Sequence, residues 1–349
     1  MRVYLKRIVW AVAILGLLIC GYFSYWIYNA VFAPNTRFES DEVHVHIPSD
    51  AGFAQVSSIL EPLLKNPSTF GAVADRKGYT TNVKPGKYAL KRGMNNNEII
   101  NTLRSANLPV RVSFNNQESL PLLAGRIAQQ IEADSLSLLQ AFNDPEFLEE
   151  AGFDADSKLG MYLPNTYEFF WNTGAREFRD RMKREYDRFW GPERMEKAKE
   201  LGLSPKQVTA LAAIVQKETV KVDERPRVAG VYLNRIKRGM LLQADPTVIY
   251  AIKKETGNYD TIIKRVLYRD LEMDSPYNTY KYAGIPPGPI SMPDITSLDA
   301  VLNPESHDYL YFVADVSNFG YHIFAKTLLQ HNRNKVQYTQ WLNSQKVLR

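Results

Sequence analysis

SPKQVTALAAIVQKE, residues 204–218, predicts a helix with one buried face. Ser204 can accept a hydrogen bond from a free backbone N–H, the proline after it suits the first helical position, and Gln207 completes a capping box. Apolar residues then recur at helical spacing as far as Val215. The next position on this face is Glu218, so a carboxylate stands where the pattern calls for an apolar side chain.

Two interpretations of Glu218 follow from this pattern. Burial of a carboxylate costs free energy unless the group is paired or protonated, and it raises the pKa. A raised pKa is what a proton-donating catalyst needs. The alternative is a structural ion pair with Arg225, Arg227 or Arg235, just downstream. The pattern alone leaves both open.

The surrounding sequence resembles one known family. The segments that carry the resemblance are IVQKET at 214–219, Asn234-Arg235 and LQADPTVIY at 242–250. They are similar to the endolytic murein transglycosylases, a family also described as YceG-like. The resemblance is most specific from Leu159 to Asn332. It implies a lyase that cuts within glycan strands, with Glu218 as the catalytic acid and then base, giving 1,6-anhydro-N-acetylmuramic acid ends.

A second segment matches the same family. Residues 275–290 place Tyr-Asn-Thr-Tyr among prolines and glycines, which excludes a helix or a central strand and predicts a rigid lip. Tyrosine rings suit stacking on sugars and bonding to their hydroxyl groups. The candidates for binding sugar or orienting Glu218 are Gln243, Asp245, Tyr277, Asn278, Thr279 and Tyr280.

The chain departs from the family pattern at three places. Asn165 follows Pro164 where the family commonly has Asp, so a charge is missing. Ser119 follows Glu118 where the family usually has Gly, and residues 291–294 (SMPD) replace a common Asn-Pro-Gly turn. The local turns are therefore expected to differ.

The N-terminus predicts a membrane anchor. Residues 8–28 carry no charge over 21 positions, enough for a helix to cross a bilayer, and aromatic residues crowd the outer end. Three basic residues within 1–7 predict that this end is cytoplasmic and that everything from about Asn29 lies outside. A cleaved signal peptide is the rival, but bulky aromatics make a poor cleavage site. Lipid attachment at Cys20 is disfavoured, because no small residue precedes it.

Composition excludes several classes of function. The chain has 43 Lys and Arg against 38 Asp and Glu, and three of the basic residues precede the anchor, so the rest is nearly neutral and gives no nucleic-acid footprint. Cys20 is the only cysteine, which excludes a disulfide and a thiol nucleophile from the exported part. His44 and His46 share one face of a strand, but no further ligand cluster supports a metal. No metal or organic cofactor is expected.

The exported part is predicted to be α+β with two domains. Residues 42–107 alternate short strands and helices, and the resemblance implies a LysM-like glycan-binding module; a plain spacer is the alternative. Residues 108–349 form the mixed α/β catalytic domain, with Glu218 on a helix. Within it, residues 176–201 predict one long charged helix. Residues 309–313 predict a buried strand, and 321–324 its hairpin partner.

Other functions compete with the transglycosylase. One is a hydrolase that pairs Glu218 with a second carboxylate, Glu168 or Asp245. Another is a membrane-anchored, non-catalytic glycan-binding scaffold of the cell wall. A serine acyltransferase is disfavoured, because neither Ser-x-x-Lys nor Gly-x-Ser-x-Gly occurs. The expected partners are the membrane and peptidoglycan glycan strands, with the cell-wall synthesis machinery as a further candidate.

Overall fold

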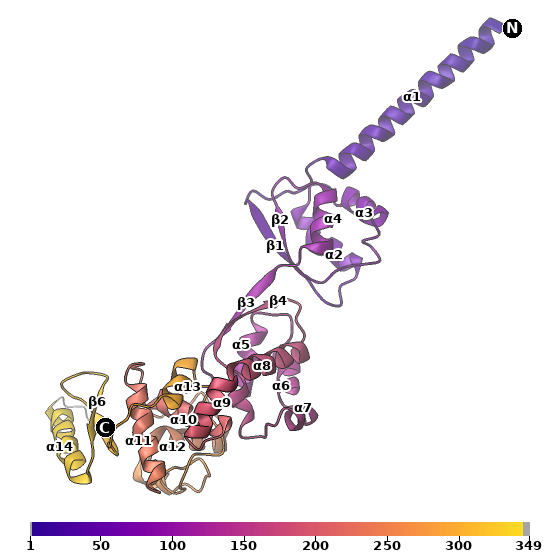
Figure 1. Cartoon of the computed structure of the whole chain (residues 1–349). Helices are drawn as coiled ribbons and strands as arrows, with labels where there is room; N and C mark the ends of the chain where they lie inside the picture. The colour runs from indigo at the N-terminus through magenta and orange to yellow at the C-terminus, as the bar shows by residue number, and fades with distance from the viewer. Residues whose placement is uncertain (1, 345–349) are drawn as a thin grey trace. The chain divides into compact units, whose positions relative to one another are not determined.

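The computed structural model describes residues 2–344. Met1, which is part of the predicted cytoplasmic segment, lies outside the described residues. So do residues 345–349, the end of the predicted catalytic domain. The fold is mixed α/β with an apolar helix at the N-terminus, as predicted. The chain divides into two compact units (Figure 1). The first takes in the chain up to Val112 with Gln130–Ala133 and Glu168–Gly174, and the second takes in Ser113–Gln129, Asp134–Tyr167 and the chain from Ala175 onward.

Helix α1 (Arg2–Phe32) contains the predicted span. Its part from Tyr4 to Phe32 is 29 residues long, and an 18-residue stretch within it has a mean hydropathy of 2.1 and is not buried against the rest of the protein. Both values suffice for a helix that crosses a bilayer. By length and composition, α1 is therefore a candidate single-pass anchor.

The first unit is a small α+β module. Strands β1 (Glu42–Ile47) and β2 (Gly86–Lys91) pair antiparallel, with Val45 opposite Tyr88. Its helices after α1 are α2 (Phe53–Leu60), α3 (Pro67–Arg76) and α4 (Asn96–Ser105), with a short 3-10 turn at Glu61–Leu63. Apolar side chains of both strands and all three helices form one buried cluster. The predicted alternation of short strands and helices is confirmed.

The second unit begins with a helical layer. Strands β3 (Pro109–Phe114) and β4 (Asn165–Phe170) pair with each other, and each contributes residues to both units. Between them lie α5 (Leu120–Ala128), α6 (Ser135–Phe142), α7 (Pro145–Glu150) and the 3-10 turn η2 (Lys158–Met161). The single helix predicted over residues 176–201 is wrong. It is two helices, α8 (Ala175–Phe189) and α9 (Pro192–Glu200), because Pro192 cannot continue the first and begins the second.

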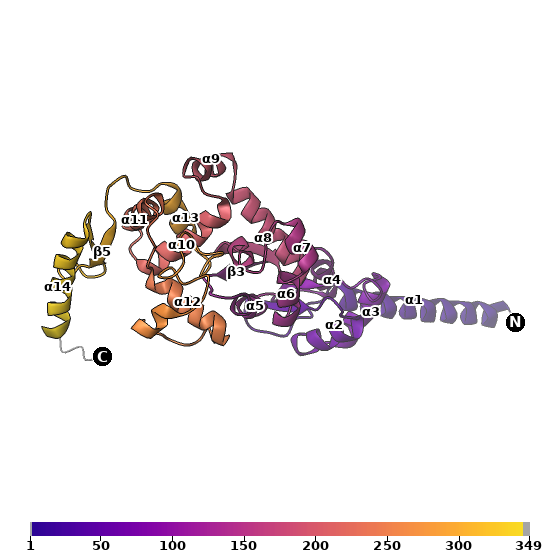
Figure 2. The same cartoon turned by 90° about the horizontal axis from the view of Figure 1, so that it is seen from below.

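Helix α10 (Pro205–Glu218) lies at the centre of the second unit. Its start is as predicted, since Ser204 and Gln207 form both hydrogen bonds of the capping box. Helices α9, α11 (Arg225–Lys237), α12 (Asp245–Thr256) and α13 (Ile295–Leu302) pack against it (Figure 2). Every residue from Val208 to Val215 is buried, so α10 is covered on all sides over two turns. A 3-10 turn, η3 (Tyr268–Glu272), follows α12.

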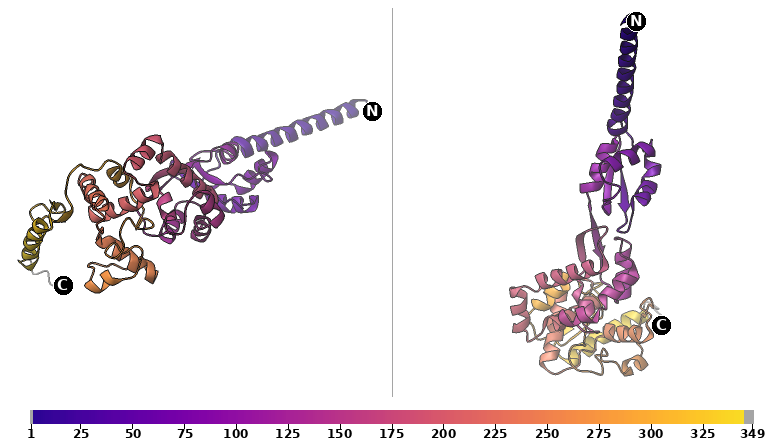
Figure 3. Two further views of the ribbon diagram at one scale, coloured as in Figure 1. Left: turned by 60° about the horizontal axis from the view of Figure 1, so that its bottom comes forward. Right: turned by 90° about the vertical axis from the view of Figure 1, so that its right-hand side faces the viewer.

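A hairpin and a last helix complete the second unit. Strands β5 (Tyr311–Ala314) and β6 (His322–Ala325) pair antiparallel, which confirms the predicted hairpin. Helix α14 (Leu328–Ser344) packs against both strands (Figure 3). The expectation of a buried strand is wrong, since all four residues of β5 are only half-buried. The reason is that β5 has one strand partner among the described residues, and its Tyr311 and Phe312 line a pocket.

Candidate active site

Glu218 is the last residue of α10 and stands at the edge of a pocket. The backbone of Thr219 is already extended, so the helix ends where the carboxylate begins. The pocket has a volume of about 370 Å³. Its lining comes from α10, α11, the segment before α12, α12 itself, the lip, β5 and α14: Glu218, Tyr232, Arg235, Leu242, Gln243, Asp245, Tyr280, Tyr311, Phe312, Leu328, His331 and Lys335.

The environment of Glu218 favours its protonated form. Burial raises the pKa of this carboxyl to about 7; the neighbouring charge of Asp245 adds to the rise, while Tyr232 and Arg235 oppose it. The hydroxyl of Tyr232 donates a 2.7 Å hydrogen bond to Oε1 of Glu218. Protein surrounds the carboxyl, yet the pocket leaves part of it accessible. A substantial fraction is therefore protonated near neutral pH and can reach a ligand.

The three downstream arginines have other partners. Arg225 pairs with Asp294 at 2.9 Å and Arg227 with Glu305 at 2.9 Å. Arg235 donates to main-chain carbonyl oxygens. Within residues 2–344, Glu218 forms no ion pair with any of them. The alternative of a structural Glu–Arg pair is therefore wrong.

Three predicted site residues share the pocket with Glu218. Gln243 and Asp245 are exposed within it, and the Tyr280 hydroxyl donates to Oδ1 of Asp245 at 2.5 Å. Gln243 has φ +51°, the left-handed conformation that usually favours glycine, and its N–H donates to the carbonyl of Thr279 at 3.0 Å. The lip thus fixes the turn that leads into α12.

The other three predicted residues are buried in the lip. The Tyr277 hydroxyl donates to Asp156 at 3.1 Å, and the Asn278 amide donates to the carbonyls of two residues on the preceding loop. The Thr279 hydroxyl lies 2.8 Å from that of Thr247, at the start of α12. All three are at most 2% exposed. Their side chains hold the lip in place, and Tyr280 alone of the four lines the pocket.

The pocket also contains residues that were not predicted as site residues. In the sequence, Tyr232 lies among apolar residues at helical spacing, Val228, Val231 and Ile236, and this pattern gives no sign of its hydrogen bond to Glu218. His331 and Lys335 come from α14, and Tyr311 comes from β5, where its ring stacks on His331 with 5.3 Å between centroids. Two signals in the sequence could have pointed to them: the spacing of His331 and Lys335, one helical turn apart, and the place of Tyr311 and His331 within the stretch that carries the family resemblance.

Two further residues lie elsewhere. Glu168, a candidate second carboxylate, is exposed on β4 and does not line this pocket. His322 bonds Glu224 at 2.9 Å through Nδ1, and its backbone N–H bonds the same carboxylate. It acts as a sheet histidine that ties β6 to the start of α11. No cluster of three or more potential metal-ligating side chains occurs in the described part of the chain.

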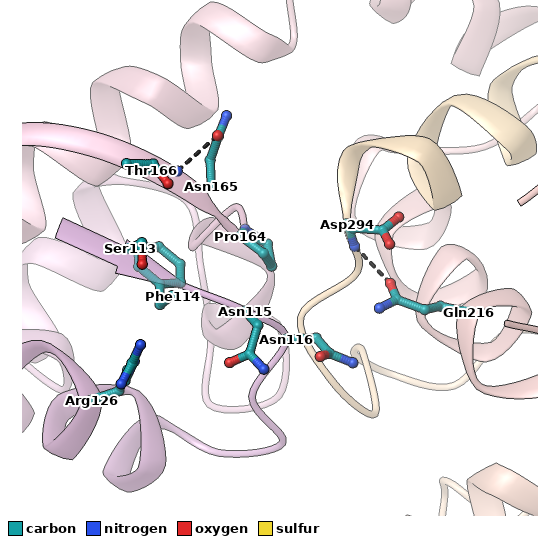
Figure 4. Close-up of a pocket in the computed structure, with 10 residues that line it drawn as sticks. All are labelled: Ser113, Phe114, Asn115, Asn116, Arg126, Pro164, Asn165, Thr166, Gln216 and Asp294. Carbon is teal, nitrogen blue, oxygen red and sulfur yellow. Dashed lines mark hydrogen bonds between the residues drawn. The ribbon is translucent and has the colours of Figure 1, made fainter. Parts of the chain in front are cut away.

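A larger cavity, of about 800 Å³, lies on another side of α10 (Figure 4). Gln216 lines it and accepts a 2.7 Å hydrogen bond from the backbone of Asp294. Asn165 and Asp294 also line it, and each belongs to one of the three departures from the family pattern. Two of these departures therefore meet at this cavity. Gln216 and Glu218 are two residues apart on a helix and point about 160° apart, and the two cavities share no lining residue, so this cavity is separate from the Glu218 pocket.

Comparisons with known proteins show the family of this chain. The model of the YceG-like family matches residues 45–337. The chain is 30% identical over 341 residues to the endolytic murein transglycosylase of Bacillus subtilis, covering 92% of this chain and 91% of that protein. It is 28% identical to the endolytic murein transglycosylase of Streptococcus pneumoniae serotype 2, of which it spans 62%.

A solved structure is also similar. The crystal structure of a YceG-like protein from Listeria monocytogenes matches with a TM-score of 0.57 and 29% identity, covering 84% of this chain and 99% of that one. Since the family model extends over most of the sequence and the Bacillus relative is matched over almost its whole length, the chain belongs to the YceG-like family.

Proposed function

We propose that this protein is an endolytic murein transglycosylase, a lyase that cuts peptidoglycan glycan strands from within, and that Glu218 is its acid and base. The observation that carries the proposal is the state of Glu218. Burial raises its pKa to about 7, it lies in an accessible pocket, and the Tyr232 hydroxyl donates a hydrogen bond to it. The family membership and the names of the relatives support the same activity.

In the first step, Glu218 acts as an acid. Its proton passes to the glycosidic oxygen between N-acetylmuramic acid and N-acetylglucosamine, and the bond from that oxygen to the muramic acid C1 breaks. A carboxyl with a pKa near the working pH is suited to this transfer, because it is substantially protonated and still acidic enough to donate. This step releases the part of the strand that begins with N-acetylglucosamine, which now has a free 4-hydroxyl group.

In the second step, the carboxylate acts as a base. It removes the proton of the muramic acid C6 hydroxyl while that oxygen bonds to C1, which gives the 1,6-anhydro ring and restores protonated Glu218. No water is consumed. The attacking group is part of the substrate, so holding it in place replaces a bimolecular step and contributes several kcal/mol, on the order of 7 to 11 in favourable cases. The Tyr232 hydroxyl stabilises the carboxylate between the two steps.

Gln243, Asp245 and Tyr280 are the proposed sugar-binding or orienting residues at the pocket, since their side chains line it. Tyr277, Asn278 and Thr279 are proposed to act through the lip, because their buried side chains hold it against Asp156 and Thr247. In the lip, Tyr280 is therefore proposed to contact the sugar, and the other three residues are proposed to position Tyr280.

The placement in the membrane is part of the proposal. The basic residues at the start of α1 favour a cytoplasmic N-terminus, with the chain after α1 on the outer side, where peptidoglycan is. The domain proposal is a LysM-like glycan-binding module at 42–107 and a catalytic domain from 108 onward. The strand–helix–helix–strand order of β1, α2, α3 and β2 supports the first part. The cell-wall synthesis machinery remains the proposed protein partner.

The reaction products test this proposal. Full-length protein in detergent is incubated with purified peptidoglycan, and the released fragments are weighed by mass spectrometry. We expect anhydro-muropeptides, each one water lighter than the hydrolysis product, from wild type, and at least about a hundredfold slower release from Glu218→Gln. Retention of the wild-type rate by Glu218→Gln would rule out the acid role.

A hydrolase is the second candidate, because one specific observation favours it. Asp245 brings another carboxylate into the Glu218 pocket, and glycosidases that use water work with two. This candidate predicts reducing ends in place of anhydro ends. The same mass measurement separates the two reactions.

A further inference from the structure

Arg235 carries a positive charge into the wall of the Glu218 pocket. Its side chain donates to the carbonyl oxygens of Leu310 and Leu242, at 2.6 and 2.7 Å, and its guanidinium lies 5.2 Å from the ring centre of Tyr311. The residue is 8% exposed. Within residues 2–344 it forms no ion pair with a carboxylate, although other arginines nearby do. Its hydrogen-bond partners are main-chain carbonyl oxygens, so its charge is available to an anionic group that enters the pocket.

Helix α14 presents two more donors to the same pocket. His331 and Lys335 both line it and are one helical turn apart. Lys335 forms no ion pair within the described residues, and Nδ1 of His331 is buried without a hydrogen-bond partner there. Burial lowers the pKa of His331, so the ring is neutral and keeps one N–H to donate. A neutral donor and an ammonium group thus stand beside each other.

The charged side chains and the histidine of the pocket come from different elements. Glu218 and Asp245 lie at the ends of α10 and α12, whereas the three nitrogen-bearing side chains come from α11 and α14. We propose that Arg235, His331 and Lys335 form a subsite for a carboxylate group. We assign that carboxylate to the peptide stem of the muramic acid residue at the cleaved bond.

The chemistry of the substrate leads to the stem, and this assignment rests on the proposed function. Both sugars of the glycan repeat are neutral, because their amino groups are acetylated and the lactyl carboxyl is joined to the stem as an amide. The stem alone carries carboxylates. An ammonium and a guanidinium bind carboxylates through charge-assisted hydrogen bonds, which are about twice as strong as neutral ones. The subsite would thus select glycan that still bears its peptides.

Binding by an inactive protein tests the subsite apart from catalysis. The ligand is a tetrasaccharide peptidoglycan fragment with peptide stems, whose amino groups are acetylated. In a matched ligand the stem carboxylates are also converted to primary amides. Full-length Glu218→Gln protein in detergent is titrated with both by calorimetry. We expect about tenfold tighter binding of the carboxylate form.

Variants of Lys335 show whether this wall is responsible. In the Glu218→Gln background, Lys335→Met is expected to lose the tenfold preference and Lys335→Arg to keep it. Arg333→Met is the matched control, since it removes a charge from the same helix at a position outside the pocket. Equal affinity for the two fragments, or a preference that survives Lys335→Met, would overturn the proposal. Failure of the proposed function would show separately, as absence of anhydro products from protein that retains Glu218.

Discussion

The hydroxyl of Tyr232 and the carboxyl of Glu218 lie 2.7 Å apart, on successive helices of the second unit. Tyr232 is 2% exposed, and burial raises the pKa of its hydroxyl well above the usual value, so the tyrosine is always the donor. The bond favours the ionised form of Glu218 and offsets part of the effect of burial. One hydroxyl therefore limits how far the pKa of the carboxyl rises.

Tyr232→Phe is predicted to raise the pKa of Glu218 further. A hydrogen bond to a charged group is worth about 1.5 kcal/mol, which corresponds to about one pKa unit. The proton of Glu218 is needed for the first step, so the alkaline limb of kcat/KM should move from about pH 7 to about pH 8. The measurement is the pH profile of anhydro-muropeptide release. Tyr186→Phe, a buried tyrosine on α8, is the control, and an unmoved limb in Tyr232→Phe would contradict the prediction.

Glu218→Gln is predicted to lose at least about a hundredfold and up to about ten-thousandfold in rate. The amide cannot donate an acidic proton or take one back, and general acid–base catalysis typically contributes that much. Release of anhydro-muropeptides in a time course is the measurement. Glu168→Gln is the matched control, because Glu168 is exposed and outside the pocket. An equal loss of rate in Glu218→Gln and Glu168→Gln would contradict the assignment of Glu218 as the acid and base.

The raised pKa of Glu218 also predicts how stability depends on pH. Between the ordinary value of 4.5 and about 7, the unfolded chain releases this proton while the folded protein keeps it. Its contribution to stability is fully present below pH 4.5 and is lost as the pH rises through 7. The full difference is about 3 kcal/mol.

Glu218→Gln removes this dependence, because the amide does not titrate. Relative to wild type, the variant should gain up to about 3 kcal/mol in free energy of unfolding between pH 4.5 and pH 8. Urea unfolding at the two pH values, followed by tryptophan fluorescence, measures the difference. A gain that is the same at both pH values would mean that Glu218 does not keep its proton in the folded protein.

The start of α10 could be predicted because its chemistry is local. Ser204 and Gln207 are three residues apart, and both hydrogen bonds of the box form within that turn. The boundary between α8 and α9 was missed for a related reason. In the sequence, apolar residues recur at helical spacing from Phe178 to Met195, so the periodicity continues across Pro192 and hides the break that proline imposes.

The pocket itself could be predicted only in part. The sequence identified the lip but not the direction of each side chain, which depends on distant partners such as Asp156 for Tyr277 and Thr247 for Thr279. Lys335 could not be connected with Glu218 at all. Its position against the pocket follows from the packing of α14 on the β5–β6 hairpin, which no local pattern encodes.

Gln243→Gly is predicted to stabilise the protein and weaken the enzyme. Gln243 is the one non-glycine residue with positive φ in the described part of the chain, and a left-handed conformation costs a side-chain-bearing residue about 1 kcal/mol that glycine avoids. Its side chain is exposed in the pocket, so little packing is lost. The free energy of unfolding should rise by about 0.5 to 1 kcal/mol. The retained strain is explained if the amide binds the glycan, and KM for peptidoglycan should then increase severalfold. Gln207→Gly, at an exposed position of α10, is the opposite control, because glycine there should lower the free energy of unfolding through loss of the capping box.

An unchanged KM in Gln243→Gly would contradict binding of the glycan by the amide. The left-handed backbone, and not the side chain, would then be the feature that matters at this turn.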